Sequence, residues 1–275
     1  MKSAAFEYSR PGTVAEAVAL LAGAEGAAMP IGGGQSLLIL MGLRLTMIDT
    51  LVDVSRLPDL REVRDDGGHV FIGASTTHAM IEDGKIPDPS SGLMSRVAGK
   101  IAYRAIRNLG TIGGSMALAD PSADWPACLM ALDAEVSIVG SDGPRWEKAE
   151  TFVRGAYETS LAPAEIVVGF RIARRKPMRW GTAKVSRKSG AFADSMAVFV
   201  ETSGEARVAL TGTTSHARIL PRVSQYAQDH GIVDPGDLRA VILDDLTEIV
   251  PDADAYQRRC HIATVSRAIT EARNP

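Results

Sequence analysis

The chain is poor in the residues that bind metals or form disulfides. Cys128 and Cys260 are its only cysteines, and its five histidines show no metal-ligand spacing. Two cysteines exclude a disulfide framework and a cysteine-ligated iron–sulfur cluster. Each cysteine is therefore expected to be a small buried apolar residue, and no metal site is predicted. If the chain exchanges electrons with a cluster, that cluster belongs to a partner.

Long hydrophobic runs are also missing. No run of roughly eighteen apolar residues is present, and the N-terminus lacks the charged-then-apolar order of a signal peptide. The net charge of -3 and the pI of 6.0 give no general attraction to nucleic acid or to an anionic membrane. We therefore expect a cytoplasmic protein. Its 275 residues, 45% hydrophobic and 23% charged, suffice for two or three globular subdomains.

The common nucleotide-binding fingerprints are absent as well. The chain contains no G-x-x-x-x-G-K-S/T run, which argues against a P-loop nucleotidase. The run GGGQSL at residues 32–37 lacks the third glycine of a Rossmann fingerprint. Neither common motif therefore explains a phosphate site here.

Two glycine-rich segments are the strongest positive signal. The letters PIGGGQS occupy residues 30–36, and GTIGGS occupies residues 110–115. Each follows an extended or apolar stretch and leads into a helix-compatible one, an arrangement that turns successive N–H groups toward one anion at a helix N-terminus. Two such segments indicate a ligand with two phosphates, a dinucleotide pyrophosphate. Either segment alone is also typical of a tight turn between a strand and a helix.

Hydrophobic periodicity predicts a mixture of helices and strands without internal repeats. Residues 14–21 carry one apolar stripe behind a capping box formed by Thr13 and Glu16. Further helices are expected at residues 37–45, 91–105, 116–119 and 125–132, and in a last helix with Ile262, Val265 and Ile269 on one face. Strands are expected at residues 27–31, 50–54, 69–74, 135–139, 166–172, 182–185, 196–201 and 207–211, with a turn at residues 141–144 and a boundary at residues 174–177.

The two glycine segments resemble those of one known family. The letters GGGQSLL at residues 32–38 are similar to its first flavin loop, and RNLGTIGGS at residues 107–115, followed by DPSAD at residues 120–124, is similar to its second. The family is the FAD-binding medium subunit of the molybdenum hydroxylases, the group of xanthine dehydrogenase and carbon monoxide dehydrogenase. The likeness spans nearly the whole chain and is loosest toward the C-terminus.

The resemblance implies an α+β fold in three parts. It predicts a two-subdomain FAD-binding fold of the PCMH/vanillyl-alcohol-oxidase-like type, followed by a smaller C-terminal α+β domain with an antiparallel sheet and helices. The predicted domains are residues 1–55 (FAD-binding subdomain 1, α/β), residues 56–175 (FAD-binding subdomain 2, α+β) and residues 176–275 (C-terminal domain of the carbon monoxide dehydrogenase flavoprotein type).

The resemblance also implies a set of FAD contacts, with no catalytic residue and no metal ligand. The predicted contacts are Pro30, Ile31, Gly32, Gly33, Gly34, Gln35, Ser36, Leu37, Thr76, Ile101, Thr111, Ile112, Gly113, Gly114, Ser115, Asp124, Val167 and Lys184.

Several of the polar contacts have simpler alternatives. Ser36, Thr111 and Ser115 are hydroxyl donors for phosphate or equally helix caps. Asp124 is either a contact to the sugar hydroxyls of FAD or the N-cap of the following helix, and both roles are compatible. Lys184 is either a charge that stabilises reduced flavin or a surface lysine on an edge strand.

The resemblance implies a role in electron exit. The chain would take electrons from a small iron–sulfur subunit and pass them to NAD, a quinone or oxygen, while a large molybdopterin subunit hydroxylates the substrate. Two alternatives remain: a self-sufficient FAD-dependent oxidase or reductase on the same scaffold, and an assembly subunit without flavin. The first needs a substrate pocket and a base, and no histidine or tyrosine constellation supplies them.

Overall fold

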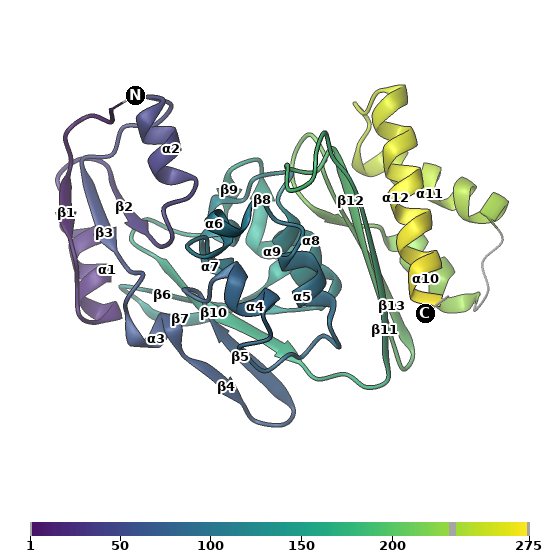
Figure 1. Ribbon diagram of the computed structural model, residues 1–275, viewed down its shortest axis with the longest axis horizontal. Helices are drawn as coiled ribbons and strands as arrows, with labels where there is room; N and C mark the ends of the chain where they lie inside the picture. The colour runs from purple at the N-terminus through teal and green to yellow at the C-terminus, as the bar shows by residue number, and fades with distance from the viewer. Residues whose placement is uncertain (1, 231–234, 274–275) are drawn as a thin grey trace.

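The computed structural model describes residues 2–230 and 235–273 of the chain. These residues form three larger sheets and one two-stranded ribbon, with helices between and around them (Figure 1). The first sheet lies at one end of the molecule, and the last helix, α12 (Ala255–Arg273), covers the other end (Figure 1).

The first sheet is small and parallel, with strand order β1–β3–β2. Its strands and helices are β1 (Glu7–Ser9), α1 (Val14–Ala22), β2 (Ala28–Ile31), α2 (Leu37–Gly42) and β3 (Thr50–Asp53). Parallel neighbours need a crossover, and α2 provides it between β2 and β3. The first glycine segment, residues 32–36, therefore lies at the carboxyl end of β2, where the chain leaves the sheet.

The start of α1 follows from its capping residues. Thr13 Oγ1 accepts a hydrogen bond of 3.1 Å from the amide of Glu16, and Glu16 Oε2 accepts one of 2.7 Å from the amide of Gly12. The helix buries Val14, Ala17 and Val18 against the first sheet, as its apolar stripe predicts. The predicted capping box is thus confirmed, with the glutamate reaching one residue beyond the cap.

The second sheet is antiparallel, with strand order β4–β5–β10–β6–β7. Its strands are β4 (Val63–Asp65), β5 (His69–Gly73), β6 (Glu135–Gly140), β7 (Gly143–Lys148) and β10 (Ile166–Ala173). The helices of this part are α3 (Pro58–Arg61), α4 (His78–Glu82), α5 (Leu93–Ala98), α6 (Arg104–Arg107), α7 (Ile112–Leu118), α8 (Asp124–Ala131) and α9 (Ala149–Phe152), and the ribbon is β8 (Val153–Gly155) with β9 (Glu158–Thr159). Helix α8 is buried along its whole length and packs against the third sheet.

The third sheet is an antiparallel meander of β11 (Met178–Val185), β12 (Ser195–Thr202), β13 (Glu205–Thr211) and β14 (Arg218–Ile219). Both of its faces are covered, and β12 shows this by strict alternation. Ala197 and Phe199 join the core under the C-terminal helices, whereas Met196 and Val198 join the core that contains α8. The C-terminal helices are α10 (Pro221–Asp229), α11 (Pro235–Ile249) and α12.

Helix α12 lies unusually close to β11, and a glycine makes this contact possible. A Cβ at Gly181 would lie 2.0 Å from the carbonyl oxygen of Ala268. We expect Gly181→Ala to lower the free energy of unfolding by about 1–3 kcal/mol, because the helix backbone must move away from the sheet. Urea unfolding measures the change. Gly12→Ala, whose Cβ meets nothing nearer than 3.4 Å, is the control, and equal stability of the two variants would contradict this account.

Several predicted elements differ from the structure at points where the backbone turns. The helix predicted at residues 91–105 is two short helices, α5 and α6, because Ala102 adopts a left-handed φ of 42° between them. The helix predicted at residues 37–45 ends at Gly42, just before Arg44 takes a φ of 60°. Strand β7 was not predicted, and it begins inside the turn expected at residues 141–144. The remaining predicted strands are confirmed within a few residues at either end.

Each of the predicted domain ranges, 1–55, 56–175 and 176–275, contains one of the larger sheets. The largest hydrophobic core nevertheless runs through all three ranges, from Val14 through Trp125 to Val198. The division into three domains therefore stays a prediction.

Candidate cofactor site

The first glycine segment presents a row of main-chain N–H groups without partners. Within residues 2–230 and 235–273, the amides of residues 32–36 donate no hydrogen bond. The segment is half-buried, and Gly34 takes a φ of 69°, which turns the chain between β2 and α2. Unsatisfied N–H groups shielded from water are unfavourable, and consecutive ones at a turn form a concave anion site. This row is therefore suited to a phosphate ligand.

The two glycine segments touch each other in space. A Cβ at Gly33 would lie 2.0 Å from the carbonyl oxygen of Leu109, and a Cβ at Gly32 would lie 3.3 Å from Thr111 Oγ1. The backbone at Gly33 can approach this closely only because glycine has no side chain. Segments from the first and second sheets thus form one continuous site, as two halves of a pyrophosphate cradle require.

The second glycine segment is built differently from the first, which corrects the expectation of two equivalent amide clusters. Residues 112–115 are not a loop but the first turn of α7. Their amides are already used: Ile112 donates to Thr76 O, Gly113 to Ala74 O, Gly114 to Thr111 Oγ1 and Ser115 to Thr111 O. In addition, α2 and α7 have only 6 and 7 residues, so their dipoles add little. The free amides of the first segment dominate the site.

Hydroxyl groups around the second segment complete the polar lining. Thr111 caps α7, accepting a bond of 3.0 Å from the amide of Gly114. Thr76 is buried, and its Oγ1 has no hydrogen-bond partner among the described residues. The hydroxyls of Ser36 and Ser115 are half-buried, and no hydrogen bond to either is formed within that same part of the chain. An orphaned buried hydroxyl is rare in native proteins, so Thr76 fits a bound ligand.

Asp124 on α8 and Lys184 on β11 of the third sheet form a buried ion pair. Lys184 Nζ on β11 lies 2.7 Å from Asp124 Oδ1, and the two side chains are 11% and 5% exposed. Burial raises the pKa of the Asp124 carboxyl, and the charge and hydrogen bond of Lys184 oppose this shift. The predicted N-cap role of Asp124 is wrong, since Ala123 precedes the first turn of α8 and Asp124 is its first residue. The surface-lysine alternative for Lys184 is also wrong: β11 is an edge strand, but the lysine side chain is 11% exposed and paired with Asp124.

The segment before Asp124 is tied to the third sheet by further hydrogen bonds. Thr211 Oγ1 donates to the carbonyl oxygens of Pro121 and Ala123, at 2.8 and 3.1 Å. The amide of Ala193 donates to Ser122 O at 3.3 Å. The Asp124–Lys184 pair therefore sits within a continuous seam between two parts of the fold.

Among the remaining predicted contacts, Gln35 donates from Nε2 to Gly33 O at 2.9 Å, and the others are apolar. Pro30 and Ile31 end β2, and Leu37 begins α2. Val167 lies in β10 and is buried in the largest core, whereas Ile101 is half-buried between α5 and α6. The structure brings the two glycine segments, Thr76 and their flanks together, and it places Asp124 with Lys184 on the seam.

Two side chains that the sequence did not single out support the second segment. The guanidinium of Arg107 forms two bonds with Glu82, at 2.8 and 2.9 Å, and also donates to the carbonyls of Ile101 and Ala102. His78 Nδ1 accepts a bond of 3.0 Å from Trp125 Nε1. Burial, together with the charge of Arg107, lowers the pKa of His78 to about 4, so its ring is neutral at pH 7. The sequence offered one signal for these two supporting residues: Arg107 is the first residue of the second motif, RNLGTIGGS at residues 107–115.

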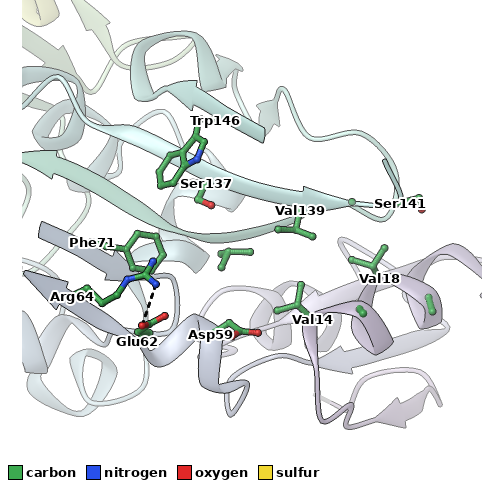
Figure 2. A pocket seen from close by; sticks show the side chains of 14 residues that line it. Val14, Val18, Asp59, Glu62, Arg64, Phe71, Ser137, Val139, Ser141 and Trp146 are labelled. Carbon is green, nitrogen blue, oxygen red and sulfur yellow. Dashed lines mark ion pairs between the residues drawn. The ribbon is translucent and has the colours of Figure 1, made fainter. Parts of the chain in front are cut away.

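A separate groove lies between α1 and the second sheet. It has a volume of about 630 Å³ between α1 and the sheet, and Val14 and Val18 face Phe71, Val139 and Trp146 across it (Figure 2). None of the predicted FAD contacts lines it. The groove is therefore distinct from the candidate cofactor site.

The described residues hold neither a cluster of metal ligands nor a helix that could cross a membrane. Nowhere in residues 2–230 and 235–273 do three or more histidine, cysteine or acidic side chains gather as a metal site would require. Over the same ranges, no helix combines the length and apolar character needed to span a bilayer.

Comparison with known proteins decides the family. The model of the FAD binding domain in molybdopterin dehydrogenase matches residues 4–174, more than half of the chain. The chain belongs to this family.

Individual relatives agree with this assignment. The carbon monoxide dehydrogenase medium chain of Hydrogenophaga pseudoflava is 37% identical over 216 residues, covering 78% of this chain and 73% of that protein. The nicotine 6-hydroxylase medium subunit of Paenarthrobacter nicotinovorans is 34% identical over 219 residues, covering 80% and 73%. A solved structure of carbon monoxide dehydrogenase from Hydrogenophaga pseudoflava, lacking the Mo-pyranopterin moiety of the molybdenum cofactor, matches with a TM-score of 0.90 at 32% identity, covering 99% of this chain and 98% of that chain.

Membership in the family establishes the general role of the chain. It is an FAD-binding medium subunit of the molybdenum hydroxylase type, an oxidoreductase component with FAD as its cofactor. The predicted family, mixed α+β fold and cofactor are thereby confirmed. The individual FAD contacts stay predictions.

Proposed function

We propose that the chain holds FAD between its first two sheets and relays electrons from an iron–sulfur subunit to NAD, a quinone or oxygen. The observation that carries this proposal is the row of amides at residues 32–36, which have no partner in the described part of the chain and lie against Leu109 and Thr111. A half-buried row of N–H groups lowers stability unless an anion satisfies it, and the FAD pyrophosphate is such an anion. An assembly subunit without flavin would have no use for this row.

The residues of the site take different parts in binding. The amides of residues 32–36 bind the pyrophosphate, and the hydroxyls of Ser36 and Ser115 donate to it. Thr76 Oγ1 completes its hydrogen bonding with the cofactor, and Asp124 accepts from sugar hydroxyls. Lys184 supplies a positive charge that favours negative charge on the ring system. Apolar contacts come from Pro30, Ile31, Leu37, Ile101, Ile112 and Val167.

The reaction needs no nucleophile or general base from this chain. FAD, when bound, supplies one-electron and two-electron redox chemistry. The chain orients it, shields it from water and stabilises its charge. Relatives are named as a medium chain and a medium subunit, which supports the assignment of the electron donor to a separate polypeptide. Substrate hydroxylation is assigned to a large molybdopterin subunit.

The test is made on the purified complex. Denaturation is expected to release FAD and no FMN, and anaerobic addition of the organic substrate is expected to bleach the flavin absorbance. A colourless preparation, or flavin that stays oxidised while the molybdenum centre is reduced, would contradict the proposal. Turnover of an organic substrate by this chain alone would favour the self-sufficient oxidase instead.

A further inference from the structure

The groove between α1 and the second sheet has apolar walls that suit a flat ligand. Its volume of about 630 Å³ lies in the range of small-molecule sites. Val14 and Val18, both buried, form the wall on α1, and Phe71 and Trp146 stand opposite them (Figure 2). The rings of Phe71 and Trp146 meet edge to face, with their centroids 6.3 Å apart. An aromatic body can therefore pack against both walls.

Trp146 is held in place although its side chain is 44% exposed. The guanidinium of Arg171 lies 4.5 Å from the centroid of its ring, a cation–π contact. Arg171 is itself paired with Glu135 at 2.7 Å. The positive charge beside Trp146 is therefore neutralised within the protein.

A hydroxyl group without a partner lies inside the groove. Ser137 on β6 lines the groove and is only 8% exposed. Its Oγ forms no hydrogen bond with any residue that the structure describes. Figure 2 shows this side chain beside Trp146 and Phe71, on the sheet side of the groove. Polar atoms buried to this degree normally have partners, so Ser137 can donate to or accept from a ligand.

The charged residues of the groove favour a cationic ligand. They are Asp59, Glu62 and Arg64. Arg64 lies 3.3 Å from Glu62, so these two charges offset each other (Figure 2). Asp59, on the exposed side of α3, has no ion-pair partner within residues 2–230 and 235–273. Its carboxylate gives this edge of the groove a net negative charge, which attracts a positively charged group.

We propose that this groove binds a planar aromatic cation, such as a protonated heteroaromatic amine. The ring system packs between the valines of α1 and Trp146. A polar atom of the ligand forms a hydrogen bond with Ser137 Oγ, and the positive charge faces Asp59. This site is separate from the proposed function, because no residue assigned to FAD lines the groove.

The test is a calorimetric titration of the FAD-loaded full chain with 9-aminoacridine, a tricyclic aromatic cation. Acridine-9-carboxylate has the same rings and the opposite charge, and we expect it to bind at least about tenfold more weakly. Asp59→Asn is expected to weaken binding of the cation about threefold, because one exposed charge contact is lost. Ser137→Ala is expected to weaken it about fivefold and Trp146→Ala about tenfold, through loss of the hydrogen bond and of the aromatic wall.

Two control variants remove the same groups far from the groove. Asp252→Asn removes an exposed carboxylate, and Tyr256→Ala removes an exposed aromatic ring on α12, at the other end of the molecule (Figure 1). Both are expected to bind the cation like the wild type, and the FAD content of every variant is measured alongside to verify its folding. Absence of binding to the wild type, equal affinity for cation and anion, unchanged affinity in the three groove variants, or equal losses in the two controls would each overturn the inference.

Discussion

Replacing Gly33 with alanine is expected to weaken FAD binding by roughly a hundredfold or more. The new Cβ would lie 2.0 Å from the carbonyl oxygen of Leu109 and 2.9 Å from Gly110 Cα, both main-chain atoms that cannot step aside. The first segment would move away from the second, and its amides would lose their alignment on the pyrophosphate. One or two charge-assisted hydrogen bonds, worth about 1.5–3 kcal/mol each, account for the expected loss. Titration of the FAD-free chain with FAD measures it.

The matched control is Gly68→Ala in the turn before β5. Neither Gly33 nor Gly68 has a left-handed φ, so alanine is compatible with the backbone conformation at both positions. The two substitutions therefore test only whether there is steric room for a Cβ. A Cβ at Gly68 meets nothing nearer than Asp66 Oδ1 at 3.6 Å, and this variant is expected to bind FAD normally. Unchanged FAD affinity in a correctly folded Gly33→Ala protein would remove the structural basis of the proposed site.

Replacing Lys184 with methionine is expected to lower the free energy of unfolding by about 3–5 kcal/mol at neutral pH. Asp124 is 4% exposed, and Lys184 is its only ion-pair partner in the part of the chain that the structure describes. Removal of the ammonium would leave a buried carboxylate without a counter-charge, next to the seam that joins the second and third sheets. Urea unfolding of the FAD-free chain measures the change without any contribution from the cofactor.

The double variant Asp124→Asn with Lys184→Met separates the charge effect from a packing effect. If an uncompensated carboxylate causes the loss, removing that charge is expected to recover most of the stability. A double variant as unstable as Lys184→Met alone would show that the lysine acts through its apolar stem. Persistence of full stability in Lys184→Met would show that water or another group solvates Asp124.

The defect of Lys184→Met is also expected to depend on pH. Burial already raises the pKa of Asp124, and loss of Lys184 raises it further above the value in the unfolded chain. Between the unfolded and the folded pKa, the folded state binds more protons than the unfolded state, so stability falls as pH rises through this interval. The loss in free energy of unfolding relative to the wild type is therefore largest above the pKa that Asp124 has in the folded variant. This loss shrinks as the pH is lowered through that pKa. A loss of stability that stays constant as the pH is lowered from 8 into the acid range would contradict an unpaired Asp124 carboxylate as its cause.

The sequence by itself determined the family and its cofactor, and it predicted which segments bind that cofactor. Glycine at residues 32–34 and 113–114, with hydroxyl residues behind, is a local pattern whose backbone requirements are visible without coordinates. The sequence also predicted most strands, the helix at residues 14–21 and α12. Their apolar residues recur with the spacing of one helix face or of one strand face.

Only the tertiary structure decided how the site is built. Whether an amide is free depends on partners distant in the chain. Among the residues that the structure describes, the amides of residues 32–36 have no partner, whereas the carbonyls of Ala74 and Thr76 accept from two amides of the second segment. The pairing of Asp124 with Lys184 joins residues 60 positions apart, and no periodicity reports such a contact. Backbone hydrogen bonds and buried charges are satisfied by whatever the fold brings near them. For that reason the sequence predicted the ligand, while only the fold decided which amides and charges already have partners.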